Sequence, residues 1–280
     1  MKILVTGSGK SGSWKIRGEQ LGAAMGATVL PSPQKMRGYD VCVLVKRPAN
    51  DIINMAHANR VPLVYDVVDA WQQIVGTEET KKPCIEWLQR RIVLTRPAGL
   101  VAASQRMAAD FREVTDVPVV ALPHHARPGL TRNPIRETIK KVGYEGGEQY
   151  LGKWRAFLTE ECKRRGWEFV INPPSLADLD IVIAVRDQTG YAPRMWKSNV
   201  KLANAQGSGT PCVLNNEAGY RETSCGAERW ADTEAEMCEQ FDYLTPHAVR
   251  AEVADRLYAA RINIEIVAQA YREWLSKLKS

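Results

Sequence analysis

Two lysines spaced one helical turn apart, Lys197 and Lys201, form the strongest chemical signal in the sequence. They lie in the stretch 194–211 (R-M-W-K-S-N-V-K-L-A-N-A-Q-G-S-G-T-P), which predicts a helix beginning near Ser198 and leading into a buried strand, P-C-V-L. A serine hydroxyl at a helix start can accept from an unpaired backbone N–H group, and a helix start attracts anions. The stretch therefore predicts a diphosphate site with Ser198 as the helix cap. The alternative is a surface helix with two solvated lysines.

Further polar residues lie close to this stretch in the sequence. Arg186 stands in V-R-D at the end of the predicted strand 180–185, at the sheet edge where α/β proteins bind ligands. Asn199 can add a hydrogen bond from the helix start. The loop Y-E-G-G contains Gly146, and glycine lets backbone N–H groups approach a sugar or a phosphate. A plain tight turn explains this loop equally well.

The first half carries two carboxylates and a histidine pair that could act on an acceptor. The predicted strand 62–66 runs into V-V-D-A-W, which puts Asp66 and Asp69 at a ligand-binding sheet edge. A carboxylate there could accept a proton from an attacking hydroxyl group or orient it. The alternative is that Asp66 caps the next helix. His124, which is followed by His125, could act as a base or hydrogen-bond a donor substrate, with packing inside a hinge as the alternative.

The glycine-rich loop Gly7–Ser13 contains G-K-S but does not fit a P-loop. The Walker pattern requires another glycine five positions before the glycine of G-K-S, and the sequence has Leu4 there. A P-loop kinase or ATPase is therefore disfavoured. The loop predicts instead a flexible backbone that approaches a cleft.

Strands and helices alternate along the chain and predict an α/β protein with two parallel, doubly wound sheets. The first alternation occupies residues 1–125. The segment 123–134 (P-H-H-A-R-P-G-L-T-R-N-P) has three prolines and no apolar periodicity, which indicates an interdomain linker. The alternation resumes over residues 126–280 and ends in a long helix or helix pair at 248–278. A length of 280 residues suits two domains.

The composition excludes several classes of protein. No stretch approaches the ~20 apolar residues of a membrane span and no signal peptide is visible, so we expect a cytoplasmic protein. The six cysteines form no C-x-x-C and none lies at zinc spacing from a histidine, which predicts no metal site made of protein ligands alone. Residues 1–125 hold 16 Lys and Arg against 11 Asp and Glu, so +5 of the net +6 lies there. Chance or an anionic partner explains this imbalance.

Two such halves, joined by a proline-rich hinge and ending in a long helix, resemble the GT-B architecture of glycosyltransferases. In that architecture two Rossmann-like domains face a central cleft, and the last helix crosses back to the first domain. The segment K-S-N-V-K-L-A-N-A-Q-G-S-G-T-P resembles the donor-binding segment of the retaining enzymes. By position, Arg186, Lys197 and Lys201 would neutralise the nucleotide diphosphate and stabilise it as a leaving group. Ser198 and Asn199 would add hydrogen bonds.

Two segments of the first half share the resemblance. G-S-W-K-I-R-G-E-Q-L-G is similar to the first loop and helix of some GT-B enzymes. This implies that Gly12 and Ser13 line the cleft and that Arg17 supplies a cation, with a solvated helix residue as the alternative for Arg17. Y-D-V-V-D-A-W is similar to a segment that follows the fourth strand of the first domain. Residues 1–125 would then bind the acceptor and residues 126–280 the donor.

Two positions depart from the pattern of the retaining enzymes. Many of those enzymes carry two glutamates eight positions apart, and the second holds the nucleotide ribose. The matching residues here are Trp196 and Asn204. Glu217 and Glu222 are the nearest acidic replacements, with surface positions as the alternative. The departure leaves the ribose contact open.

The resemblance implies a glycosyltransferase that moves a sugar from a nucleotide-diphosphate sugar to an acceptor hydroxyl group. Retention of configuration is expected, with no permanently bound cofactor and no required divalent metal. The basic first half favours an anionic acceptor, and hydroxymethylated bases in DNA, as in bacteriophage DNA-modifying glucosyltransferases, fit it. A cell-envelope lipid or saccharide is the second acceptor class. A nucleotide-sugar-binding protein without catalysis is the alternative that the missing glutamates favour. Donor base, donor sugar and oligomeric state stay open.

Overall fold

The computed structural model describes residues 1–69 and 80–278 of the chain. Its first sheet contains six parallel strands in the order β2-β1-β3-β4-β5-β6. These strands are β1 (Ile3–Gly7), β2 (Thr28–Val29), β3 (Val41–Val45), β4 (Leu63–Val68), β5 (Gly99–Ala102) and β6 (Val119–Ala121). The helical segments between them are the π-helical η1 (Trp14–Gln20), α1 (Leu21–Ala24), α2 (Asn50–Ala58), α3 (Lys81–Thr95) and α4 (Gln105–Arg112).

The second sheet contains five parallel strands in the order β11-β10-β9-β7-β8. These strands are β7 (Lys141–Tyr144), β8 (Glu168–Ile171), β9 (Ile181–Ala184), β10 (Cys212–Leu214) and β11 (Arg229–Trp230). The helical segments of this half are η2 (Glu148–Tyr150), α5 (Lys153–Arg164), η3 (Leu176–Asp178), α6 (Tyr191–Met195), α7 (Val200–Ser208), α8 (Ala218–Glu222), α9 (Glu234–Leu244), α10 (His247–Ala259) and α11 (Ile264–Lys277).

Strand β3 shows why the first sheet must be covered on both faces. Every residue of its V-C-V-L-V sequence is buried. Successive side chains of a strand point to opposite faces, so Cys42 and Leu44 enter one apolar cluster while Val43 enters the other. A continuous apolar run is the expected composition of a parallel strand with helices on both sides.

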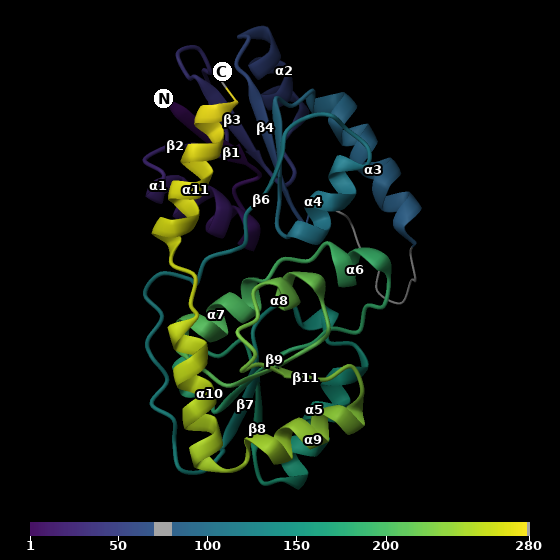
Figure 1. The fold of residues 1–280 in the computed structure, drawn as a ribbon, viewed down its shortest axis with the longest axis vertical. Helices are drawn as coiled ribbons and strands as arrows, with labels where there is room; N and C mark the ends of the chain where they lie inside the picture. The colour runs from purple at the N-terminus through teal and green to yellow at the C-terminus, as the bar shows by residue number, and fades with distance from the viewer. Residues whose placement is uncertain (70–79, 279–280) are drawn as a thin grey trace.

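The C-terminal part of the chain is a helix pair that divides between the two sheets (Figure 1). Helix α10 packs on the second sheet, where Val253 and Leu257 belong to its core. Helix α11 crosses back, and its residues Val267, Tyr271 and Leu275 share a cluster with β1 and β3. This crossing is the one expected of the GT-B architecture.

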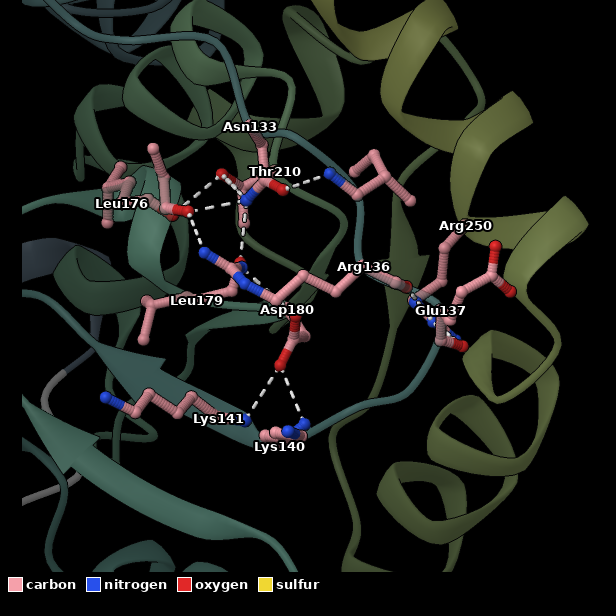
Figure 2. A network of polar contacts seen from close by, with 12 residues as sticks. Asn133, Arg136, Glu137, Lys140, Lys141, Leu176, Leu179, Asp180, Thr210 and Arg250 are labelled. Carbon is pink, nitrogen blue, oxygen red and sulfur yellow. Dashed lines mark hydrogen bonds and ion pairs between the residues drawn. The ribbon is translucent and has the colours of Figure 1, made fainter.

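The linker is fixed to the second sheet at its far end (Figure 2). The Asn133 amide donates to the backbone carbonyl of Leu179 at 2.6 Å and to the Thr210 hydroxyl at 3.1 Å. The buried Asp180 accepts from the backbone N–H groups of Lys140 and Lys141, at the start of β7. The linker is also bound nearer its start, where the Ala126 N–H donates to the Ile262 carbonyl at 2.8 Å and the Arg127 N–H donates to Asn204 at 3.1 Å. The boundary at residues 125 and 126, and the acceptor and donor roles of the halves, stay predictions.

Helix α6 joins the two halves away from the linker. Trp196, directly after α6, is buried against Phe111 of α4, with ring centroids 5.5 Å apart and edge to face. Its indole N–H donates to Asp110 at 2.8 Å. Glu222 of α8 accepts from the backbone N–H groups of Gln105 and Arg106, at the start of α4. A side chain of the second half is thus part of the first half's core, which fixes how the two sheets face each other.

Candidate donor-binding site

A cavity of about 290 Å³ lies where the carboxyl ends of the two sheets meet. Its first wall follows β1, β3, β4 and β6, and its second wall follows β7 and β9 and includes the start of α7. Side chains from both halves therefore face one space. The lining residues are Gly12, Ser13, Ile16, Lys46, Asp69, His124, Tyr144, Gly147, Tyr150, Arg186, Lys197, Ser198, Val200 and Lys201.

Lys201 is a buried cation without a carboxylate partner. Its ammonium group has no hydrogen-bond partner among the described residues and lies 3.7 Å from the centre of the Tyr144 ring. Burial lowers the pKa of Lys201 well below its usual range, and the charge of Arg186 adds to this effect. An unpaired ammonium group is costly to bury. This position therefore suits an anionic ligand.

Arg186 is held by an acidic residue of its own half. Its guanidinium group donates to both carboxylate oxygens of Glu217, at 2.5 and 3.2 Å, and to the Tyr220 hydroxyl at 3.3 Å. Burial opposes the charge, but Glu217 outweighs it and raises the pKa of Arg186. Glu217, predicted as a donor contact, acts here as the fixed counterion of the arginine.

Lys197 reaches across the cavity to the other half. Its ammonium group lies 3.2 Å from Asp69 Oδ2, and Lys46 lies 2.6 Å from Asp69 Oδ1. Burial would raise the pKa of Asp69, but the charges of Lys197 and Lys46 hold it well below its usual range. Burial lowers the pKa of Lys197, and Asp69 opposes this in part. Asp69 is thus a carboxylate shared by two lysines, next to the Ser13 hydroxyl at 3.4 Å.

The start of α7 differs from the prediction. Helix α7 begins at Val200 with Asn199 as its N-cap residue, and no side chain caps it. The prediction of Ser198 as the cap is therefore wrong, because the helix begins one residue further along. The Asn199 side chain accepts from the backbone N–H of His124 at 2.7 Å and donates to its carbonyl at 3.1 Å. It joins the helix start to the linker, while Ser198 lines the cavity.

The two histidines differ in their surroundings. His124 lines the cavity, and neither ring nitrogen has a hydrogen-bond partner among the described residues. Burial and the charge of Arg17 lower its pKa well below the usual range, so the ring is neutral. His125 points elsewhere and contacts Gln20 at 3.1 Å. Only the first of the pair can meet a ligand in this cavity.

Asp66 and Arg17 do not line the cavity. Asp66 lies inside β4, which extends to Val68, and not at the strand end where the prediction put it. Its carboxylate lies 3.8 Å from Arg17, and both side chains are almost fully buried. Arg17 also donates to the backbone carbonyl of Leu122. Arg17 is therefore neither the predicted cleft cation nor the solvated helix residue of the alternative. The π-helical segment turns its side chain inward.

Two further predicted contacts lie outside the cavity lining. The Gly146 N–H is occupied by Asn172 at 2.8 Å, and the neighbouring Gly147 lines the cavity instead. Glu222 accepts hydrogen bonds from backbone N–H groups at the start of α4. Asn204, which stands where related enzymes carry a glutamate, donates to Glu145 at 3.0 Å. Glu145 is also paired with Arg127 at 2.6 Å and does not line the cavity.

Lys46 is the charged lining residue that the sequence did not reveal. It follows β3 in a K-R pair with Arg47 that belongs to no recognised motif. Its position after an apolar strand was the one available signal, because parallel strands end at the ligand edge. The motif residues Ala70 and Trp71 of Y-D-V-V-D-A-W lie outside the described residues.

Within residues 1–69 and 80–278, no group of three or more His, Cys, Asp or Glu side chains is arranged to hold a metal ion. In the same part of the chain, no helix is long and apolar enough to cross a membrane.

Solved structures match this chain over nearly its whole length, although no protein-family model and no curated protein matches the sequence. HepE of Anabaena in complex with UDP and glucose is 14% identical with a TM-score of 0.65, over 99% of each chain. The lipopolysaccharide outer core galactosyltransferase WaaB is 10% identical with a TM-score of 0.57, over 99% of this chain and 100% of its own. TarM of S. aureus is 12% identical with a TM-score of 0.60, over 85% of this chain and 55% of its own. The chain therefore has the GT-B fold of glycosyltransferases, and that prediction is confirmed.

Proposed function

We propose that this protein is a glycosyltransferase that takes a nucleotide-diphosphate sugar as donor and transfers the sugar to an acceptor hydroxyl group. The observation that carries the proposal is the unpaired Lys201 ammonium group, buried next to Arg186 and Lys197 at the junction of the two sheets. Such a cluster needs an anion, and a diphosphate supplies charge at several oxygens.

The charges around the cavity support a diphosphate rather than a neutral sugar. Glu217 neutralises Arg186, and Asp69 serves both Lys46 and Lys197. When a bound anion keeps Lys201 protonated, four cations face two carboxylates among the described residues of the site, so two positive charges are in excess. A nucleotide-diphosphate sugar carries about two negative charges at neutral pH. As the sugar–phosphate bond breaks, the cations stabilise the further charge that develops on the leaving diphosphate.

The structural neighbours support a uridine nucleotide as the donor class. HepE has been captured with UDP and with UDP-glucose, and WaaB is described as a galactosyltransferase. In this proposal residues 126–280 hold the donor, and residues 1–125 hold the acceptor. Ser198 and the backbone at Gly12, Ser13 and Gly147 contribute hydrogen bonds around the sugar phosphate. Retention of configuration rests on the resemblance of the 197–211 segment.

An anionic acceptor is the finer part of the proposal. Lys10, Lys15 and Arg47 are exposed and follow β1 and β3, at the same sheet edge as the cavity. A phosphate backbone would contact this edge, and hydroxymethylated bases in DNA are the acceptor class that we propose. Binding to such DNA should weaken steeply between 50 and 200 mM salt. Binding that salt does not change, or sugar transfer only to envelope lipid or saccharide extracts, would exclude DNA.

The donor is tested by thermal unfolding of the protein with nucleoside diphosphates and nucleotide sugars. A ligand that binds the native state raises the unfolding temperature, and UDP or UDP-glucose should give the largest rise. K201M should abolish the rise, while K163M, which changes an exposed lysine of α5, should keep it. No rise with any nucleotide would overturn the proposal. A rise without release of UDP from the sugar would favour the non-catalytic binding protein.

A further inference from the structure

Asp69 divides its two carboxylate oxygens between the two halves of the molecule. Oδ1 lies 2.6 Å from Lys46 and 3.4 Å from the Ser13 hydroxyl, both residues of the first half. Oδ2 lies 3.2 Å from Lys197, a residue of the second half. Lys46 also donates to Ser13 at 3.1 Å. One oxygen is therefore bound inside its own half, and the other is bound across the cavity.

Lys197 lies beside the place where the donor diphosphate must go. It shares the cavity wall with Arg186 and Lys201, and its side chain is 10% exposed. A diphosphate in contact with these cations would bring negative charge close to Asp69 Oδ2. Two anions repel each other strongly in a partly buried site, where the effective dielectric constant is well below that of water. Asp69 and a diphosphate therefore compete for Lys197.

Backbone hydrogen bonds fix the point from which the Lys46 side chain extends toward Asp69. Its φ of 60° lies in the left-handed region, which is unusual for a residue other than glycine. The Lys46 N–H donates to the backbone carbonyl of Asp66 at 2.8 Å, and its carbonyl accepts from the Tyr65 hydroxyl at 2.7 Å. Both bonds tie this conformation to β4, so the fold fixes where the side chain starts.

We propose that Asp69 and the donor diphosphate are alternative partners of Lys197, and that Lys46 is the positioning residue that retains Asp69 after the exchange. This inference rests on the proposed function. The released Oδ2 then accepts a hydrogen bond from the acceptor hydroxyl group on the first wall of the cavity. Oδ1 stays with Lys46 and Ser13.

The charge of Asp69 fits this orienting role better than that of a base. Among the described residues, the charged and titratable groups around it are Lys46 after β3, Lys197 before α7 and His124 after β6. The lysines keep the carboxylate ionised at neutral pH, which makes it a strong hydrogen-bond acceptor and a weak base. Asp69 therefore orients the acceptor hydroxyl group without taking its proton, which passes to an oxygen of the departing diphosphate as the new glycosidic bond forms.

A double-mutant cycle on UDP binding tests the exchange without knowledge of the acceptor. UDP affinity is measured by titration calorimetry for the wild type, D69N, K46Q and the double variant. D69N should bind UDP at least fivefold more tightly, because the competing charge is gone. K46Q should bind it at least threefold more weakly, because Asp69 then depends on Lys197 alone. In the D69N background, K46Q should change the affinity by less than twofold.

Matched controls separate local from general charge effects. D51N removes an exposed carboxylate at the start of α2, and K35Q removes an exposed lysine between β2 and β3; neither side chain lines the cavity. Both should change UDP affinity by less than twofold. If the D69N variant bound UDP no more tightly than the D51N variant, the proposed exchange of partners would be overturned. An equal loss from K46Q in both backgrounds would show direct phosphate contact and would overturn the positioning role. Failure of the wild type to bind any nucleotide would instead overturn the proposed function.

Discussion

Two groups of charges lie near the carboxyl ends of the first sheet and are built differently, although their carboxylates, Asp66 and Asp69, are close in the sequence. Arg17 and Asp66 form one pair, with side chains 0% and 1% exposed, and neither lines the cavity. The cluster at the cavity contains Lys46, Asp69 and the cations of the second half. The first group is balanced in charge, although both Asp66 oxygens lack a hydrogen-bond partner among the described residues. The second group has more cations than carboxylates among the described residues and opens onto a cavity.

The two groups show how a buried charge can be assigned to structure or to ligand binding. A buried cation with its own carboxylate is already compensated, so a ligand would have to replace an existing partner. A buried cation without one is compensated only when a ligand arrives. Arg17 is a cation of the first kind, and its carboxylate is Asp66, whose pKa is raised by burial against the effect of Arg17. Lys201 belongs to the second.

The largest expected effect concerns the balanced pair. R17M leaves Asp66 buried without its cation, so the free energy of unfolding should fall by about 3–5 kcal/mol. Urea unfolding at pH 7 measures this change. The double variant R17M/D66N should recover part of the loss, because no lone charge remains. If R17M kept its stability but lost UDP binding, Arg17 would belong to the ligand site and the comparison would fail.

The next effect concerns the unpaired cation. K201M should lower the rate of UDP release from the donor by about 10²–10³-fold, equivalent to roughly 3–4 kcal/mol, since it removes a charge that acts on the leaving group. The free energy of unfolding should stay constant or rise, because an uncompensated buried charge has been removed. Kinetic assay and urea unfolding of the same preparation give both values. Lower stability with unchanged turnover would make Lys201 a structural residue.

A smaller effect concerns pH and the histidines between the two groups. Burial and then Arg17 lower the pKa of His125 to about 4, against an ordinary value of 6.5. Between these values the unfolded chain binds the extra proton and the folded protein does not, so stability falls as pH decreases below 6.5. His125 alone should remove about 2 kcal/mol between pH 6.5 and pH 5. H125N should show a flatter dependence in urea unfolding at several pH values. An equal slope in both proteins would contradict this origin.

The sequence predicted the parts of the site that depend on local pattern. The one-turn spacing of Lys197 and Lys201, and Arg186 at the end of an apolar strand, follow from helix and strand geometry, and the structure brings all three to one cavity. The GT-B fold followed from the alternation of elements and the proline-rich hinge. A serine directly before a helical segment indicates an N-cap, and the Ser104 hydroxyl accepts from the Met107 N–H at the start of α4.

The remaining residues could not be predicted because their positions depend on contacts far away in the sequence. Arg17 looked exposed on an ordinary helix, but the segment is π-helical and points the side chain toward Asp66. Glu222 looked available for the donor, but it binds the backbone of α4 across more than a hundred residues. Lys46 became visible only when Asp69 and Lys197 were placed beside it in space. The spacing of residues within one segment does not predict contacts between distant segments.

The return of α11 to the first sheet sets an order for folding during synthesis. The ribosome makes β1 and β3 early, but Val267, Tyr271 and Leu275, which cover one face of these strands, emerge only after the whole second sheet. Until then, an apolar face formed by residues such as Ile3 and Val43 lacks its cover and is open to aggregation or to chaperones. Domains generally fold in order from the N-terminus, but here the first sheet must be completed last. A circular permutant that places α11 ahead of β1 would let the first half close before the second is made.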